Sequence, residues 1–198
     1  MIKTIQVGPL ETNCYLIELN GNGILIDPGD EPDKILCEIG DKKIDFIILT
    51  HLHFDHIGAV SEVKKATGAK VLCSEKDLEI LDENLLKKDE IDGFLETNHE
   101  LNCLNGFMFK CLFVPGHTPG SICLYFPEQN TLFSGDTIFR GSIGVTHFKG
   151  GDFADLKKSI EIKLFTLPDD TRVYPGHGDD FILGEYKEEI TRVLINSM

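Results

Sequence analysis

The sequence contains no tryptophan and no apolar run near the roughly 18 residues that a membrane-crossing helix needs. Its first residues lack the apolar stretch and the small-residue cleavage site of a secretory signal. The six cysteines form no CxxC pair and no spacing typical of secreted scaffolds, so we expect buried, reduced thiols that act as small hydrophobic residues. These absences predict a cytoplasmic protein.

Basic residues are also few. The chain has 19 Lys and Arg residues and 33 Asp and Glu residues, which gives a formal charge of −14. Such a surface repels phosphate backbones and anionic membranes, so we expect neither a nucleic acid nor a membrane as partner. The length of 198 residues fits a single domain over residues 1–198. The expected partner is a small-molecule substrate, and the expected state is a monomer or a small homo-oligomer.

The hydrophobic pattern predicts two similar halves, each with sheet followed by helix. Strands are expected at residues 2–7, 14–19, 24–26, 46–49, 70–73, 106–114, 121–126, 131–134 and 172–174. Helices are expected at residues 33–39, 59–67, 155–167 and 185–196, with helical turns over 74–100. The halves share a motif, since an apolar strand runs into Pro-Gly-His at 113–117 and again at 173–177. This repetition favours an α/β protein in which two sheets pack face to face with helices outside.

Residues 50–58 read THLHFDHIG and hold four potential metal ligands in nine positions. His51 and His53 are two residues apart, so their rings leave the same side of an extended segment. Asp55 and His56 follow where the chain must turn, and their side chains therefore reach a second point close by. The spacing predicts that this segment binds metal.

Three further candidate ligands stand at predicted strand ends beside turn residues: His117, Asp136 and His177. A strand end in a stiff sheet fixes a ligand, while Gly and Pro let the backbone turn close to it. Imidazole and carboxylate without thiolate suit zinc, manganese or iron. Seven ligands are too many for one tetrahedral ion but suit two ions that share one carboxylate. Taken singly, each of the three residues is also compatible with an ordinary turn, cap or surface position.

These motifs resemble those of the metallo-β-lactamase superfamily. The matching segments are residues 50–56, 115–120, 134–137 and 175–177, in the same order and with similar spacing. The resemblance implies a four-layer αββα sandwich of two mixed β-sheets, with helices on the outer faces and the site at one edge of the sheets. It also implies two ions, the first on His51, His53 and His117, the second on Asp55, His56 and His177, with Asp136 bridging them. Asp27 is predicted to orient a ligand histidine.

Within the superfamily, residues 116–121 and 136–144 resemble short, single-domain hydrolases of the glyoxalase II type. The resemblance implies hydrolysis of a thioester or ester, with Asp55 and Asp136 as catalytic residues. The chain departs from this group at Val145, where the group typically has a Lys or Arg that contacts glutathione, and at His147, a position often occupied by Tyr or Asp. The candidate substrate contacts are Arg140, Val145, His147 and Lys149, with Lys187 as a further source of positive charge.

Two divalent ions close together lower the pKa of a bridging water to about 7, which supplies hydroxide at neutral pH. Zinc is the expected metal, with iron and manganese as alternatives. Three other functions are compatible with the same residues. One is a persulfide-dioxygenase-like oxidoreductase with a single iron on His51, His53 and Asp136. The others are a lactonase or similar small-ester hydrolase, and a metal-binding protein without catalysis.

Overall fold

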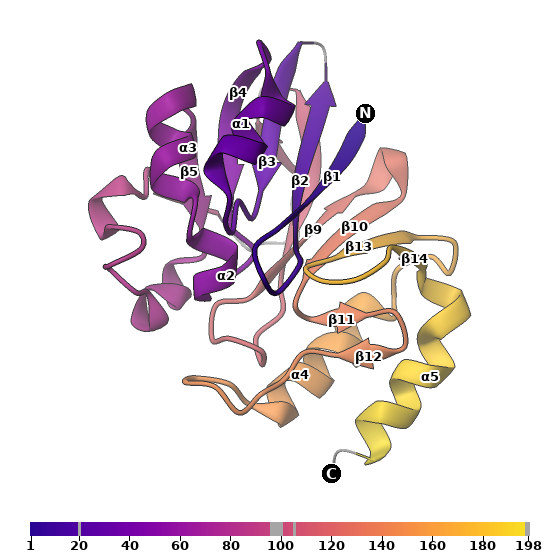
Figure 1. Cartoon of the computed structure of the whole chain (residues 1–198). Helices are drawn as coiled ribbons and strands as arrows, with labels where there is room; N and C mark the ends of the chain where they lie inside the picture. The colour runs from indigo at the N-terminus through magenta and orange to yellow at the C-terminus, as the bar shows by residue number, and fades with distance from the viewer. Residues whose placement is uncertain (20, 96–100, 105, 197–198) are drawn as a thin grey trace. The chain divides into compact units, whose positions relative to one another are not determined.

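The structure is a computed structural model that describes residues 1–19, 21–95, 101–104 and 106–196, without the side chains of 101–103 (Figure 1). Its internal contacts gather in two compact units, and each is described by itself. Unit 1 comprises Met1–Leu95 and Leu104–Phe107, and unit 2 comprises Glu96–Cys103 and Met108–Met198. The single domain expected over residues 1–198 stays a prediction.

Unit 1 is built on a six-stranded mixed sheet. Its strands, in spatial order, are β1 (Ile2–Val7), β2 (Thr12–Leu19), β3 (Asn22–Ile26), β4 (Lys43–Ile48), β5 (Lys70–Cys73) and β6 (Gly93–Phe94). The first three strands are antiparallel, and β3 to β6 are parallel. Since parallel neighbours require a crossover, helix α1 (Pro32–Ile39) joins β3 to β4, and α2 (Phe54–Ile57) and α3 (Val60–Thr67) join β4 to β5.

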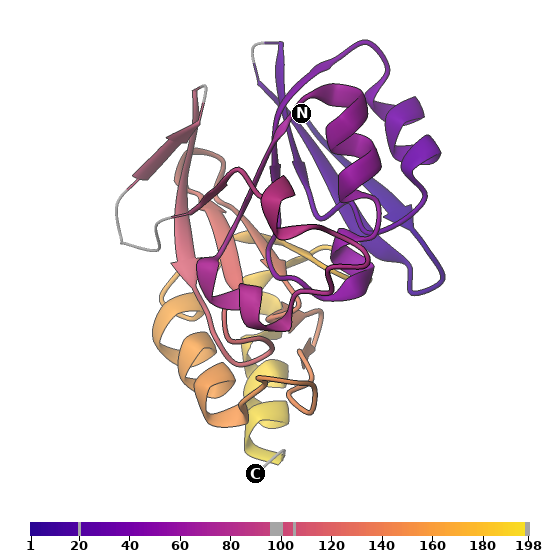
Figure 2. The same ribbon diagram turned by 90° about the vertical axis from the view of Figure 1, so that its left-hand side faces the viewer.

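Local sequence explains where these helices begin and end. Helix α1 has Pro32 in its first turn, where the missing N–H costs nothing, and ends at Gly40, whose N–H bonds the Leu36 carbonyl. Helix α3 ends at Gly68 in the left-handed conformation. Figure 2 shows α1 and α3 side by side against one face of the sheet. The core there joins the helices to the strands through these buried residues: Leu25, Ile35, Ile39, Ile47, Val60, Val63 and Val71.

Unit 2 contains the second six-stranded mixed sheet. Its order is β14 (Phe181–Ile182), β13 (Arg172–Pro175), β10 (Thr131–Gly135), β9 (Ile122–Phe126), β8 (Phe107–Phe113) and β7 (Leu101–Leu104). Strands β10 and β13 are parallel, whereas β9 is antiparallel to both of its neighbours. Helix α4 (Phe153–Ser159), its π-helical continuation Ile160–Leu164 and α5 (Leu183–Asn196) contribute these residues to the core: Leu156, Ile160, Leu164, Ile190 and Leu194. A small hairpin, β11 (Ile138–Phe139) and β12 (Ser142–Ile143), precedes α4.

The expected fold class is confirmed, since the chain folds into two mixed sheets that both carry helices. Several short elements differ from expectation. Between β5 and β6 the chain forms two 3₁₀ helices, Glu75–Ile80 and Lys88–Glu90, and residues 96–100 of the expected helical turns lie outside the described residues. The expectation missed the two-residue strands β6, β11, β12 and β14, because two residues carry no readable period.

The expectation for the cysteines is largely confirmed. Cys14, Cys73, Cys111 and Cys123 are buried free thiols and Cys37 is exposed, while the side chain of Cys103 lies outside the described residues. Burial raises the pKa of Cys73, Cys111 and Cys123 to about 12, and burial beside Asp27 raises the pKa of Cys14 well above its usual value. These four thiols are therefore protonated at neutral pH and serve as packing groups.

Candidate metal centre

The parallel strands of unit 1 bring the first set of candidate ligands to one edge of the sheet. Asp27 follows β3, and His51 follows β4 after a short extension. The Asp27 N–H bonds the Ile48 carbonyl at 3.1 Å, and the Leu49 N–H bonds the Leu72 carbonyl at 2.9 Å, so the ladder continues past the strand ends. Because parallel strands end at the same edge, residues 21 and more positions apart in sequence come together.

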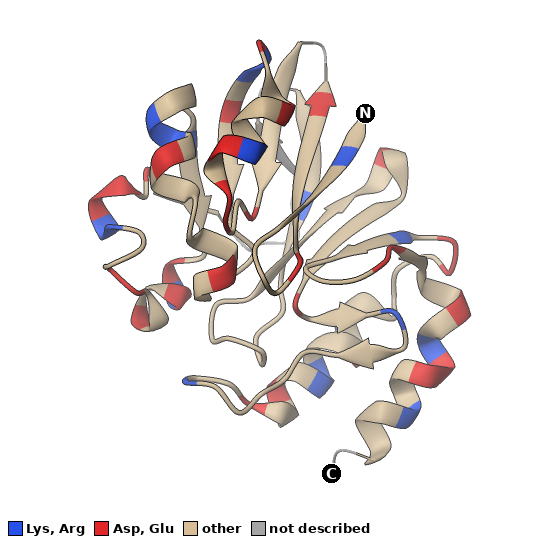
Figure 3. Cartoon of the chain, viewed as in Figure 1, with Lys and Arg blue, Asp and Glu red and all other residues tan. Residues whose placement is uncertain are grey.

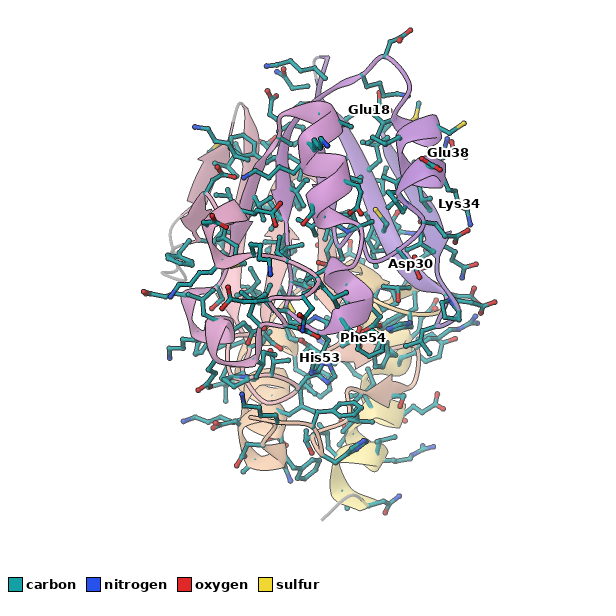
Figure 4. All side chains as sticks on the ribbon, turned by 60° about the vertical axis from the view of Figure 1, so that its left-hand side comes forward. Glu18, Asp30, Lys34, Glu38, His53 and Phe54 are labelled. Atoms are coloured by element: carbon teal, nitrogen blue, oxygen red, sulfur yellow. The ribbon has the colours of Figure 1, made fainter. Side chains whose placement is uncertain are left out.

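The THLHFDHIG segment changes conformation within the motif. His53 is extended and precedes helix α2, whose first residue, Phe54, follows it directly (Figure 4). The His56 N–H bonds the His53 carbonyl at 3.0 Å. This turn brings the His51 ring to 4.9 Å from His53 and 4.1 Å from His56, measured between ring centroids. Unit 1 therefore gathers the three histidines of the motif.

Asp27 organises two of these rings through a buried network. Its Oδ2 accepts from His56 Nδ1 at 3.0 Å and from Thr50 Oγ1 at 2.6 Å, while its Oδ1 accepts from the Thr50 N–H at 2.7 Å. Thr50 Oγ1 lies 3.1 Å from His51 Nδ1, which donates to it in this arrangement. Donation from both Nδ1 atoms directs the lone pair of both Nε2 atoms outward, as a metal ligand requires. Asp27 thus bonds the ring of one candidate ligand directly, and the orienting role expected of it stays a prediction.

The Asp55 carboxylate contacts the adjacent His56 and the distant Thr12, both in unit 1. Its Oδ2 lies 3.5 Å from His56 Nε2 and accepts a hydrogen bond from Thr12 Oγ1 at 3.2 Å. The turn after β3 packs directly on α2, because a Cβ on Gly29 would lie 1.7 Å from the Asp55 carbonyl oxygen. Position 29 therefore requires a glycine, because any side chain there would prevent α2 from packing against this turn.

We expect the Thr12 hydroxyl to position the Asp55 carboxylate for metal binding. Thr12→Val removes the donor and keeps the shape, so it should weaken metal affinity about tenfold, as the loss of a hydrogen bond to a ligand does elsewhere. Thr12→Ser should retain wild-type affinity. Competition with a chromogenic chelator measures this. The control is Thr67→Val, which removes a hydroxyl bonded to the Val63 carbonyl in α3 and should leave affinity unchanged. Equal affinities for Thr12→Val and wild type would refute the role.

Unit 2 gathers the second set of candidate ligands at the ends of three strands. Strands β8 and β10 are both antiparallel to β9, and β13 is parallel to β10, so all three end at the same edge. His117, Asp136 and His177 follow these ends. Asp136 Oδ2 lies 3.6 Å from His117 Nε2 and 3.5 Å from His177 Nε2. His117 Nδ1 donates to the Val145 carbonyl at 2.7 Å, which leaves Nε2 for a metal.

The donor atoms within each unit fit divalent ions. Ligand arms of about 2.1 Å in tetrahedral geometry place neighbouring donor atoms about 3.4 Å apart. The separations of 3.5 Å between Asp55 and His56, and of 3.6 and 3.5 Å around Asp136, are close to this value. A third group, Asp27, His51 and His56, has donor atoms within 4.8 Å of one another. Nitrogen and oxygen donors of this kind suit zinc, manganese or iron.

The four candidate substrate-binding residues, Arg140, Val145, His147 and Lys149, differ in their bonding partners and neighbours. Arg140 Nε donates to the Tyr186 hydroxyl at 2.6 Å, and its Nη1 donates to Asp179 Oδ2 at 3.2 Å. Val145 contributes its carbonyl to His117 and exposes its side chain. The His147 ring lies 4.4 Å from Phe148, and Lys149 is exposed.

Lys187 Nζ donates to the Phe165 carbonyl at 3.0 Å and to the Leu167 carbonyl at 3.4 Å. It also forms an ion pair with Asp169 at 2.5 Å, so Lys187 bonds three groups of the chain that follows the π-helical segment.

The sequence did not single out Thr12, Thr50 or the Val145 carbonyl as positioning groups. Thr50 had a signal, because it directly precedes His51. Thr12 had none, since it is 43 residues from Asp55 and meets it only in the folded sheet. A backbone carbonyl has no signature in the sequence at all.

Histidine and aspartate donors at the ends of strands in two mixed sheets define a metal-binding α/β protein. Residues 7–177 match the Metallo-beta-lactamase superfamily, and the chain belongs to that superfamily. Membership implies that divalent metal is bound, and it supports a hydrolase.

Two solved structures and one curated protein illustrate the similarity. Hydroxyacylglutathione hydrolase GloC of Haemophilus influenzae is 36% identical, with 94% of each chain covered. The structure of TTHA1623 in a di-iron-bound form has a TM-score of 0.84 and 36% identity over 95% of this chain and 98% of that one. The structure of the BLEG-1 B3 metallo-beta-lactamase has a TM-score of 0.88 and 31% identity over 98% and 99%.

Proposed function

We propose that this protein hydrolyses the thioester or ester bond of a small molecule with water activated between two divalent ions. The observation that carries the proposal is the place of Asp136, whose Oδ2 lies within 3.6 Å of two histidine Nε2 atoms at the ends of separate strands. A carboxylate placed in this way suits a ligand shared between two ions. The similarity to a hydroxyacylglutathione hydrolase supports the reaction class.

In this proposal the two sets of donors act together. His51, His53 and His117 would hold one ion, Asp55, His56 and His177 would hold the other, and Asp136 would serve both. Bound divalent ions lower the pKa of water to about 7 and polarise a carbonyl oxygen.

Residues of the chain orient the histidine ligands and the attacking water for this reaction. Asp27 and the Val145 carbonyl hold the rings of His56 and His117 so that Nε2 is the free donor. Asp55 and Asp136, the proposed catalytic carboxylates, are placed to accept a hydrogen bond from the attacking water. A C–O bond from the water oxygen to the acyl carbon forms as the C–S or C–O bond of the substrate breaks, and the protons of the water pass to the leaving group or to the solvent. A thiol leaves readily as thiolate because its pKa is low, so no additional acid is required.

Zinc is the proposed metal, with iron or manganese as alternatives. The nitrogen and oxygen donors accept all three, and the similar TTHA1623 structure is described as di-iron-bound. The metal found in protein from its own source decides among them.

The test combines metal analysis with a substrate panel. Protein purified without chelator should contain about two divalent ions per chain. It should hydrolyse thioesters faster than lactones, cephalosporins or persulfides. Dialysis against chelator should abolish the activity, and returning the metal should restore it. Protein free of metal would contradict the proposal, and so would oxygen consumption with a persulfide as the main activity.

The remaining expectations about partners stay predictions. A small-molecule substrate, no nucleic-acid or membrane partner, and a monomer or small homo-oligomer are part of this proposal, as is a cytoplasmic location. None of the helices in the described part of the chain has the length and apolarity needed to cross a membrane.

A further inference from the structure

The ligand-bearing segment that follows β4 leaves the sheet between two neighbouring strands, β3 and β5. Its Leu49 N–H still bonds the Leu72 carbonyl of β5 at 2.9 Å. Further along, Thr50 and Leu52 are each 1% exposed, so their backbone N–H groups are shielded from water. A buried N–H that lacks an acceptor is costly, and these two groups therefore need acceptors from elsewhere in the chain.

Two aspartates supply these acceptors, one from the segment after each neighbouring strand. Asp27 follows β3, and its Oδ1 accepts from the Thr50 N–H at 2.7 Å. Asp77 lies in the 3₁₀ helix after β5, and its Oδ2 accepts from the Leu52 N–H at 2.9 Å. Side-chain carboxylates therefore continue the hydrogen bonding of β4 beyond the end of its ladder.

Asp77 is fully buried, which is rare for a carboxylate. Figure 3 shows more acidic than basic positions along the segment between β5 and β6. All of this segment is described, and Asp77 is its one buried acidic residue. A buried carboxylate loses its hydration, so it is retained only where donors of the protein replace the water. The Leu52 N–H, 25 residues away in sequence, is such a donor.

The Leu52 N–H belongs to the peptide group that joins His51 to Leu52. A hydrogen bond to it fixes the rotation of this peptide plane, and with it the direction of the flanking side chains of His51 and His53. The centroids of these two rings lie 4.9 Å apart. Ligands must be held within about 0.5 Å of their binding geometry, so rotation of this peptide would turn the rings away from a shared ion.

We propose that Asp77 is a positioning residue of the metal centre. Its carboxylate fixes the backbone between His51 and His53 and thereby directs both rings at one ion. The inference rests on the two-ion site of the proposed function, and it does not depend on the reaction that the ions support.

The contacts of the other candidate ligands of unit 1 make this effect selective. Asp27 bonds the His56 ring at 3.0 Å, and Thr12 bonds the Asp55 carboxylate at 3.2 Å. Neither contact involves Asp77. Loss of the Asp77 carboxylate should therefore weaken one of the two ions and spare the ion that His56 and Asp55 would hold.

The experiment measures the zinc affinity of each site by competition with chromogenic chelators of graded strength. Asp77→Ala leaves the Leu52 N–H without this acceptor and should weaken one ion at least about tenfold, with the other within about threefold of wild type. Asp77→Ser, whose hydroxyl is too short to reach this N–H, should give the same result and replaces Asp77→Ala if that variant does not fold. Asp77→Asn keeps a carbonyl oxygen for the bond and should restore most of the affinity.

A second measurement detects the contact itself in the zinc-loaded wild-type protein. NMR should show a scalar coupling through the hydrogen bond, from the Leu52 amide nitrogen to the carboxyl carbon of Asp77. Absence of this coupling would overturn the inference whatever the variants show.

The control variant is Asp92→Ala. Asp92 also accepts a backbone hydrogen bond in unit 1, from the Val71 N–H at 2.7 Å, but at the start of β5 rather than after its end. The variant removes a carboxylate of the same kind and should leave both zinc affinities unchanged.

The outcomes separate this inference from the proposed function. Equal weakening of both ions in Asp77→Ala, no weakening of either, or a loss in Asp77→Asn as large as in Asp77→Ala would overturn the positioning role, while two bound ions would still support the proposed function. Two ions with the expected selectivity, together with no hydrolysis of any thioester or ester, would refute the proposed function alone.

Discussion

Replacing Asp136 with Ala should lower the metal content of the purified protein from about two ions to one or fewer per chain, and kcat/KM by at least about 10³-fold. The physical reason is the position of its carboxylate, 3.5 and 3.6 Å from the Nε2 atoms of His177 and His117. Removing a shared ligand weakens both ions together. Elemental analysis and initial rates of thioester hydrolysis measure the two effects.

Two further variants make this result specific. Asp136→Asn keeps the shape of the side chain but removes its charge, and it should lose metal nearly as completely. Asp170→Ala removes an exposed carboxylate of the same unit and should change neither quantity. Circular dichroism should show a native spectrum for all three variants. Near-wild-type turnover in Asp136→Ala would overturn the ligand assignment.

Gly116→Ala should lower the free energy of unfolding by about 3 kcal/mol, the sum of a strained backbone and an overpacked contact. Gly116 has a φ of 137°, and a Cβ there would lie 2.2 Å from the Leu156 backbone nitrogen. Leu156 belongs to α4, so the strain is relieved only if the turn before His117 moves away from the helix. Urea denaturation followed by circular dichroism measures the loss, and metal affinity should fall with it.

The matched control is Gly178→Ala. Gly178 has a φ of 75° and stands directly after His177, but a Cβ there would meet no atom within 4 Å. The variant should therefore lose only about 1 kcal/mol, from backbone strain alone. Equal losses for the two variants would show that packing of the turn against α4 does not matter.

The sequence predicted the fold class because the elements that define it are strongly patterned. Strand β4 ends in a continuous apolar run over residues 46–48, and helix α1 is bounded by Pro32 and Gly40. The short strands β11 and β12 and the helix α2 inside the ligand motif escaped prediction. Pairing and packing with distant residues stabilise elements of two to four residues, so local pattern does not reveal them.

The sequence also indicated which candidate ligands come together within each unit, and their binding of metal stays a prediction. His51, His53 and His56 lie within six residues, and unit 1 brings their rings together. His117 and His177 each follow a Pro-Gly turn, and unit 2 places both beside Asp136. The bonding partners of the charged side chains were less predictable, because Arg140 and Lys187 bond to partners 39 or more and 18 or more residues distant in sequence.

What the sequence by itself determined is which residues have the chemistry to bind metal and which strand ends carry them, because spacing and turn residues act over a few positions. Only the tertiary structure decided how these groups are oriented. Asp27 bonds His56, Thr12 bonds Asp55, and the Val145 carbonyl bonds His117. Each of these contacts joins residues 28 or more positions apart, and the register of the sheets and the course of the loops determine which atoms meet.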